Sequence, residues 1–228
     1  MIKQKLLLAL FFTIILTSLG AQNDVNQYDK SGKRHGVWTK NYDGTDIIRY
    51  SGTFDHGKEI DTFKYYKVKN KKAVLSAIKV FNSQNNLAKV TFLASNGKKV
   101  SEGEMDGKKF IGKWVYYHNN SDKILIEEVY NSEGVLNGER LVYYINDNIA
   151  EKALYKQGKL DGPSYWFTEK KDTLRMSTYS DDKLNGLSIY NDASGKLSAK
   201  GDYKDNLKVG AWLYYKDGEL EKEVDHSN

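Results

Sequence analysis

A short phrase of glycine and aromatic residues recurs through most of the chain. Residues 209–223 read VGAWLYYKDGELEKE, residues 111–120 read IGKWVYYHNN, and residues 59–68 are a weaker version, EIDTFKYYKV. Recurrence at a fixed period of roughly 20 to 50 residues indicates a repeat architecture in which each unit is one supersecondary element. This feature constrains the fold more than any other in the sequence.

The residue that precedes each aromatic pair by a few positions sets the period. These anchor positions are Gly36, Asp61 in place of a glycine, Gly112, Gly138, Gly162, Gly186 and Gly210. The last four intervals are 26, 24, 24 and 24 residues, and one degenerate repeat fits between Asp61 and Gly112. The period is therefore about 24 residues, and it blurs across residues 67–99, where we expect either a longer hairpin or a kink between two sub-arrays.

Two columns of aromatic residues follow the anchors. Two positions after the anchor stand Trp38, Phe63, Trp114 and Trp212, and four positions after it stand Tyr65, Tyr116, Trp166, Tyr190 and Tyr214. Arg140, Ser164 and Ser188 interrupt the first column. Residues two apart in a strand face the same way, so both columns are predicted to lie on one face of a sheet.

Each repeat is predicted to be two short antiparallel strands with two turns. Asp217-Gly218 is a strong two-residue hairpin signal, because both positions of such a turn favour a positive φ. The anchor glycine either leaves room for a large ring from the next repeat or permits a local bulge. Since one hairpin cannot bury its own apolar side, neighbouring repeats must add side by side.

Composition supports an all-β fold class. The chain has 17 tyrosines, 19 glycines and the single proline Pro163, and no window keeps a helical apolar period. We expect an elongated array of antiparallel β-hairpins, a meander of roughly 16 strands in a single curled sheet with an aromatic-rich concave side, since open sheets beyond about 10 strands usually curl or split.

The N-terminus has the layout of a secretory signal peptide, predicted over residues 1–21. Lys3 and Lys5 precede an apolar run at 6–16, which is followed by small residues up to Ala21. An uncleaved anchor is the alternative, but the run is shorter than the roughly 20 residues that span a bilayer. The repeat domain then covers 22–228, with no integral membrane segment after cleavage, in a protein exported to the periplasm, the outer envelope or the medium.

Charge and residue inventory indicate a protein that is not an enzyme. Without Lys3 and Lys5 the chain keeps 33 of its 35 basic residues against 30 acidic ones, so no nucleic-acid partner is expected. There is no cysteine, and the four histidines lack any metal-binding spacing. We predict no catalytic residue, metal or cofactor, and we interpret His35 and His118 as solvated turn residues.

Three segments carry a resemblance to a known family. GKRHGVW at 32–38, GKKFIGKWVYY at 107–117 and YKDNLKVGAWLYYKDGEL at 203–220 resemble the bacterial MORN-repeat variant, whose YwqK-like members are often labelled antitoxins of toxin-antitoxin systems. The resemblance covers most of residues 28–224 and implies a β-hairpin array. Related eukaryotic arrays imply a role as a protein-interaction scaffold, with membrane-lipid binding also proposed.

The aromatic columns are the one constellation in the sequence that reaches beyond folding. The first hypothesis is an envelope or secreted scaffold that binds another protein through nine residues: Trp38, Phe63, Tyr65, Trp114, Tyr116, Trp166, Tyr190, Trp212 and Tyr214. The alternatives are a module that binds cell-envelope glycans, whose sugar faces would lie on the rings, and an antitoxin-like neutralising partner. The rings also have a purely structural interpretation, in which they pack as the core.

Overall fold

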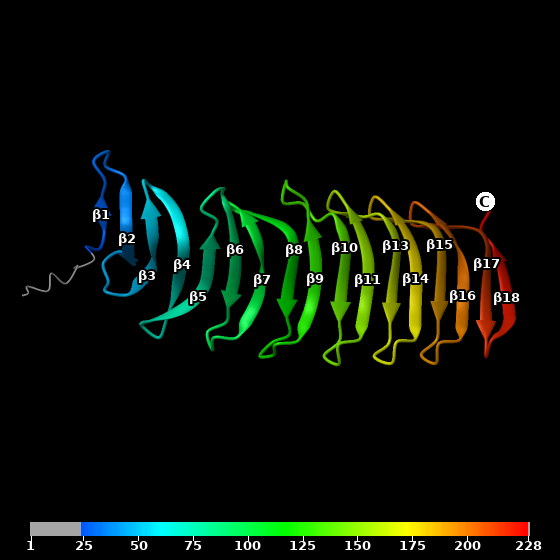
Figure 1. The fold of residues 1–228 in the computed structure, drawn as a ribbon. Helices are drawn as coiled ribbons and strands as arrows, with labels where there is room; N and C mark the ends of the chain where they lie inside the picture. Colours follow the sequence, from blue (N-terminus) through cyan, green and yellow to red (C-terminus); the bar gives the residue numbers. More distant parts are fainter. Residues whose placement is uncertain (1–23, 228) are drawn as a thin grey trace, which may run out of the picture.

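A computed structural model describes residues 24–227 as strands and turns without a helix (Figure 1). The predicted signal peptide, residues 1–21, lies outside the described residues. Over 24–227 no helix is long and apolar enough to cross a membrane.

Eighteen strands are formed within the described residues. In chain order they are β1 (Gln27–Tyr28), β2 (Arg34–Asn41), β3 (Ile48–Asp55), β4 (Lys58–Lys69), β5 (Lys72–Phe81), β6 (Leu87–Leu93), β7 (Lys99–Asp106), β8 (Lys109–Tyr117), β9 (Ile124–Tyr130), β10 (Gly138–Tyr143), β11 (Ile149–Lys156), β12 (Lys159–Leu160), β13 (Gly162–Phe167), β14 (Thr173–Ser180), β15 (Lys183–Asn191), β16 (Leu197–Lys204), β17 (Leu207–Lys216) and β18 (Glu219–Asp225). The number exceeds the expected 16 because β1 is a two-residue strand and one strand is divided at Asp161 into β12 and β13, both of which pair with β11.

The strands form one antiparallel meander. From β1–β2 to β17–β18, each strand pairs with its neighbour in the chain, with β12 and β13 acting as one strand. Figure 1 shows the strands side by side in chain order, with β1 at one end and β18 at the other. The all-β hairpin array predicted from the repeats is confirmed.

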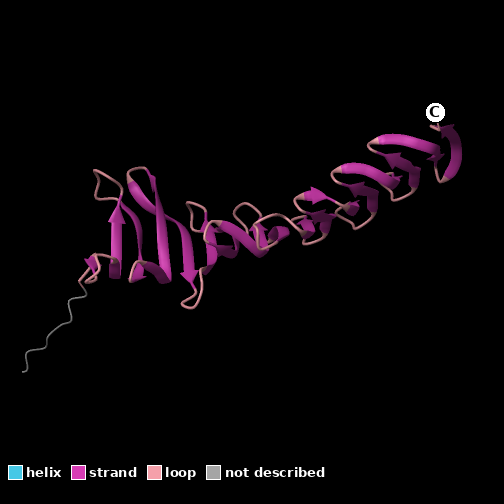
Figure 2. Cartoon of the chain, turned by 90° about the horizontal axis from the view of Figure 1, so that it is seen from above, coloured by secondary structure: helices cyan, strands magenta, loops and turns pink. Residues whose placement is uncertain are grey.

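The array is an open ribbon that twists along its length. Figure 2 shows the strands turning progressively between the N-terminal and C-terminal parts. Adjacent strands in a sheet rotate by about 20 to 25° relative to one another, because the backbone of L-residues favours that hand of twist. Summed over so many strands, this rotation gives the elongated twisted form.

Two-residue hairpin turns occur at both edges of the ribbon, and Asp181-Asp182 is one at the edge opposite to Asp217-Gly218. Asp217 and Gly218 have φ values of 55° and 92°, as their sequence predicts, and Asn70 and Lys71 have 50° and 58°. Other turns at the edge that carries Asp217-Gly218 are longer and use side-chain caps. Asp192 is one such cap, where Oδ1 accepts from the backbone N–H of Ser194 at 2.8 Å.

The anchor glycines are required by backbone conformation. Gly112 has φ +62°, and an added Cβ there would meet nothing within 4 Å. Gly112, Lys113 and Trp114 of β8 together lie opposite Gly103 alone, because the register shifts between Glu102 and Glu104. The bulge alternative is therefore correct, and the idea that an anchor glycine makes room for a ring is wrong.

The same bulge explains the exceptional anchor. Asp61 replaces glycine and also has a positive φ of 56°, which aspartate tolerates better than most residues. In the segment 67–99, β4 extends to 12 residues and pairs with β5, which matches the longer-hairpin alternative. The degenerate repeat is on β6, where Ala88 and Val90 pair regularly with β7.

Two apolar clusters form the core of the N-terminal half. One is built from Trp38, Phe54 and Phe63, and the other from Ala88, Val90, Met105 and Trp114. Phe81 packs against both clusters. The core thus follows the ribbon along one face instead of filling a space between two layers.

Candidate functional site: the aromatic face

A continuous row of side chains crosses sixteen strands on the tryptophan-bearing face. We call it the aromatic row, and its in-register members are Lys40, Tyr50, Tyr65, Ala77, Phe92, Ser101, Tyr116, Ile126, Val142, Glu151, Trp166, Arg175, Tyr190, Ala199, Tyr214 and Lys222. With about 4.8 Å between neighbouring strands, the row is roughly 70 Å long.

Five of the nine residues predicted to bind a partner lie in the aromatic row. They are Tyr65, Tyr116, Trp166, Tyr190 and Tyr214, and each is half-buried. Their rings thus keep accessible surface while their bodies are fixed by neighbours.

The other four predicted residues lie in a second row, two positions earlier on the same face. Trp38, Phe63, Trp114 and Trp212 are buried, with exposed fractions of 8%, 0%, 0% and 1%. They belong to the packed interior of the face. A partner would therefore meet the aromatic row that lies beside them.

A single-layer sheet buries Trp114 because its ring lies flat over a glycine. A Cβ on Gly103 would be 2.5 Å from the ring, and Phe110 stacks on it with 3.8 Å between centroids. The indole N–H donates to the carbonyl of Glu104 at 3.0 Å. This carbonyl adjoins the bulge, so the hydrogen bond satisfies a backbone group that the interrupted ladder leaves free.

The arrangement recurs at the two ends of the ribbon. Trp212 lies over Gly201, where an added Cβ would be 2.4 Å from the ring, and its indole N–H donates to Asp202 at 3.0 Å. Trp38 donates in the same way to the carbonyl of Gln27 at 3.0 Å. Ring burial and backbone satisfaction are therefore coupled in each of these repeats.

Repeats that lack the ring change both members of the pair. Ser188 lies opposite Ser177, with 2.9 Å between the two hydroxyl oxygens. Lys152 pairs with Tyr165, so the next pair in the same register is Ala153 and Ser164. All four side chains are buried. A large ring over glycine is thus replaced by two small residues, which explains how the sequence column is interrupted while the sheet continues.

Cations lie among the rings of the C-terminal half. Arg175 is 4.5 Å from the centroid of Trp166 and 5.4 Å from that of Tyr190. Its guanidinium also donates to the hydroxyls of Ser177 and Tyr179, each at 2.9 Å. Contacts of this kind stabilise a cation on an aromatic face and hold both groups in place.

Lys208 makes the equivalent contact three strands further along, in β17. Its Nζ lies 4.1 Å from the centroid of Trp212 and donates to the hydroxyl of Tyr214 at 2.9 Å. The accessible rings of this half therefore stand beside fixed positive charge, so they offer both apolar surface and hydrogen-bond donors.

A charged network divides the face near its middle. Arg140 donates to Glu128 and Glu151, each at 3.1 Å, and the hydroxyl of Tyr130 donates to Glu128 at 2.7 Å. Burial raises the pKa of Tyr130, and the neighbouring Tyr116 and Glu128 add to the effect. The side chains of all three charged residues are less than a quarter exposed, so their pairing is needed for the fold.

The fold favours the neutral form of two tyrosines of the row. Burial raises the pKa of Tyr65, and the nearby Glu59 adds to the effect, since the Tyr65 hydroxyl donates to that carboxylate at 3.3 Å. Burial also raises the pKa of Tyr116. Tyr65 and Tyr116 therefore present uncharged aromatic groups whose chemistry is contact and hydrogen bonding.

Sequence columns missed the members of the row that lie on the returning strands. Tyr50 and Arg175 each stand eleven residues before the next anchor, at Asp61 and Gly186. That spacing is the signal that would have found them. Antiparallel pairing places the residue eleven positions before the anchor opposite the residue four positions after it.

Two histidines also differ from their interpretation as solvated turn residues. His35 is exposed, as predicted, but it lies within strand β2 and not in a turn. His118 has its Nε2 3.1 Å from the carbonyl of Tyr143 in the next repeat. Tyr42 and Tyr144 make the same kind of link, with their hydroxyls donating to carbonyls of the following repeat at 2.6 and 2.7 Å.

Fold and face together define a single-sheet β-hairpin repeat protein whose aromatic row carries rings on both sides of a charged network. A scan against protein-family models gives no match, and no curated protein matches the chain.

Proposed function

We propose that the protein is a non-catalytic scaffold that binds another envelope or secreted protein through the aromatic row. The observation that carries this proposal is the unbroken register of sixteen positions on one face, seven of which hold half-buried aromatic rings. A surface that is fixed in place loses little side-chain entropy when a partner binds, which favours affinity.

The chemistry of the row suits a protein partner. Tyrosine, tryptophan and arginine are the residue types that most often dominate binding energy at protein interfaces. In the C-terminal half these types meet, since Arg175 lies between Trp166 and Tyr190. We place the strongest contacts there, where positive charge is fixed beside accessible rings.

Two features of the sequence, its signal-like segment and its family resemblance, also support this proposal. The signal-like segment 1–21 supports export, and with it a partner in the periplasm, the outer envelope or the medium. Resemblance to the MORN-repeat variant supports scaffolding as well. An antitoxin-like role would be the same binding with a toxin as the partner.

A crosslinking pull-down from native envelope and secreted fractions tests this function. The bait is the chain from Gln22, compared with a Tyr116→Ser, Tyr214→Ser variant. The matched control is Tyr117→Ser, Tyr215→Ser, which removes the neighbouring tyrosines on the opposite face. We expect one abundant protein to be captured by the wild type and by the control and lost in the row variant.

The result that contradicts the proposal is equally clear. If the folded row variant captures the same protein as the wild type, the partner does not bind on this face. If neither captures any protein, the scaffold function is wrong.

A second candidate function, glycan binding, is favoured by one feature of the row. The ring of Tyr190 is half-buried, and its hydroxyl lies 3.3 Å from that of Tyr203, so an apolar ring face and hydroxyl groups occur together. Sugars offer the complementary combination. Titration with cell-wall fragments should then change the fluorescence of the half-buried Trp166, and a flat titration would exclude this function.

A further inference from the structure

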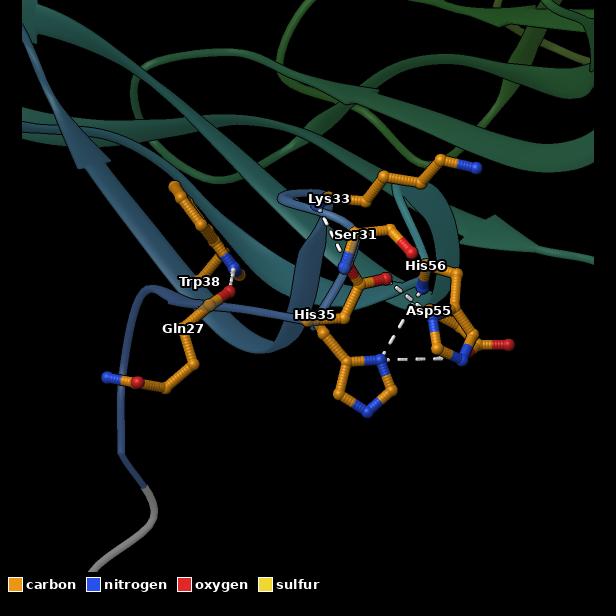
Figure 3. A network of polar contacts seen from close by, with 8 residues as sticks. Gln27, Ser31, Lys33, His35, Trp38, Asp55 and His56 are labelled. Carbon is orange, nitrogen blue, oxygen red and sulfur yellow. Dashed lines mark hydrogen bonds and ion pairs between the residues drawn. The ribbon is translucent and has the colours of Figure 1, made fainter.

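Two histidines and an aspartate converge at the N-terminal end of the ribbon, away from the middle of the aromatic row. His35 is in β2, Asp55 ends β3, and His56 begins the turn to β4 (Figure 3). Gly36 pairs with Phe54, so the next position outward places His35 opposite Asp55. Residues twenty positions apart in sequence thereby become neighbours.

The turn directs His56 back toward β2. His56 and Gly57 have φ values of 45° and 88°, and the backbone N–H of Gly57 donates to the carbonyl of Arg34 at 2.8 Å. The two imidazole rings lie 4.8 Å apart between centroids, tilted by 34°. The fold therefore holds both rings on the same side of the hairpin.

Donor atoms of the three side chains lie close to metal-binding distances. Asp55 Oδ1 is 3.5 Å from His35 Nδ1 and 3.8 Å from His56 Nε2, and one donor from each residue lies within 4.8 Å of the others. A tetrahedral Zn²⁺ ion with donors about 2.0–2.1 Å away keeps each pair of donors about 3.3 Å apart. All three residues are exposed, so small side-chain rotations close the remaining gap.

Asp29 orients His56 from the neighbouring turn. Its Oδ1 accepts the backbone N–H groups of Ser31 at 2.8 Å and Lys33 at 2.9 Å, and only 9% of its side chain is exposed. Its Oδ2 lies 2.6 Å from His56 Nδ1. Because an ionised carboxylate only accepts hydrogen bonds, Nδ1 carries the proton and Nε2 is the nitrogen turned toward Asp55.

This is the arrangement that supports metal-binding histidines in general. The ring nitrogen that does not bind the metal donates to a carboxylate or carbonyl, which fixes the tautomer and the ring orientation. Asp29 supplies that carboxylate from a rigid position. The histidine and its support come from different hairpins, so the arrangement depends on the folded chain.

We propose that His35, Asp55 and His56 form a binding site for a divalent first-row transition metal such as Zn²⁺, with Asp29 as a positioning residue. Two imidazoles with one carboxylate favour these metals over Ca²⁺ and Mg²⁺, which prefer sets of oxygen ligands. Three protein ligands leave a fourth position open to water or to a side chain of a bound partner.

Calorimetric titration of the folded chain from Gln22 with ZnCl₂ tests the site. We expect one Zn²⁺ per chain, loss of this binding in His35→Ala and in His56→Ala, and an affinity about 10- to 100-fold weaker in Asp29→Asn. His118→Ala is the matched control, because it removes a histidine outside the cluster, and it should bind Zn²⁺ like the wild type.

Histidine NMR signals keep the test independent of folding defects. In the wild-type chain, Zn²⁺ should shift the ring signals of His35 and His56 and leave those of His118 and His226 in place. Two results overturn the proposal: no saturable binding to the wild type, or unchanged binding by a His35→Ala, His56→Ala double variant.

Discussion

The change Gly103→Ala tests the packing of a ring on glycine. The new Cβ would lie 2.5 Å from Trp114, about 1 Å closer than a normal carbon contact of about 3.5 Å. Trp114 has little freedom to move, since it is fully buried, stacks on Phe110 and donates its N–H to Glu104. The ring must therefore shift by about that distance, which breaks the indole hydrogen bond.

The expected loss of stability is about 2–4 kcal/mol. Overpacking of this kind costs about 1–3 kcal/mol, and a buried donor without a partner adds about 1–3 kcal/mol. Against this, alanine lowers the entropy of the unfolded chain relative to glycine, which contributes about 0.4–1 kcal/mol of stability. Gly103 lacks a positive φ, so no backbone strain enters the sum.

Urea unfolding followed by far-ultraviolet circular dichroism measures the effect in two backgrounds. In a Trp114→Ser background, Gly103→Ala should be neutral or slightly stabilising, because the chain already pairs Ala153 with Ser164 at the equivalent place. Gly112→Ala is the control. It meets no atom but has φ +62°, so it should cost about 1–2 kcal/mol in both backgrounds.

The stability loss from Gly103→Ala in the wild type, compared with that in the Trp114→Ser background, tests whether the new methyl group meets the ring. An equal loss from Gly103→Ala with and without the Trp114 ring would show that the ring is not what the new methyl group meets. Unchanged stability in the wild-type background would refute the packing argument as well.

Two further predictions concern ionisable groups. Burial raises the pKa of Tyr117, Tyr143 and Tyr203 from 10.0 to about 12. The fold therefore favours their protonated form, and the free energy of unfolding should fall as the pH rises from about 10 to 12. Phenolate absorbance of the native and the urea-unfolded chain measures the two titrations, and coincident titrations would refute the prediction. Arg140→Ala removes the ion-pair partner of Glu128 and Glu151 and should cost about 3–5 kcal/mol in urea unfolding. Lys152→Ala removes a more exposed ion pair and should cost less than about 1 kcal/mol. Equal losses would contradict the difference in burial.

Much of the fold is encoded locally and was predictable for that reason. Asp217-Gly218 specifies its own turn through the φ values that its residues tolerate, and period-two alternation places Trp212 and Tyr214 on one face. Such features depend on a few neighbouring residues. The hairpin array follows from their repetition.

Features that depend on register were not predictable from columns. Gly103 and Trp114 are eleven residues apart, and they meet only because the bulge at Gly112 sets three residues opposite one. The convergence of His35 with His56 arises in the same way from the pairing of β2 with β3. His35, Asp55 and His56 come from two strands and a turn. Rules that search for metal ligands at short fixed spacings within one helix or loop therefore do not find them.

The order of the strands also determines how the molecule would respond to tension. β1 and β18 lie at opposite ends of the ribbon (Figure 1), so a pull between them acts along the inter-strand hydrogen bonds, which run perpendicular to the strands. Such a load opens bonds one after another, as in a zipper, and meets less resistance than shear between strands. Each released repeat of 24 residues would have an extended length of roughly 80 Å, against the roughly 10 Å that its two strands span in the ribbon. A partner bound across several hairpins would clamp them together and raise the force at which the ribbon extends.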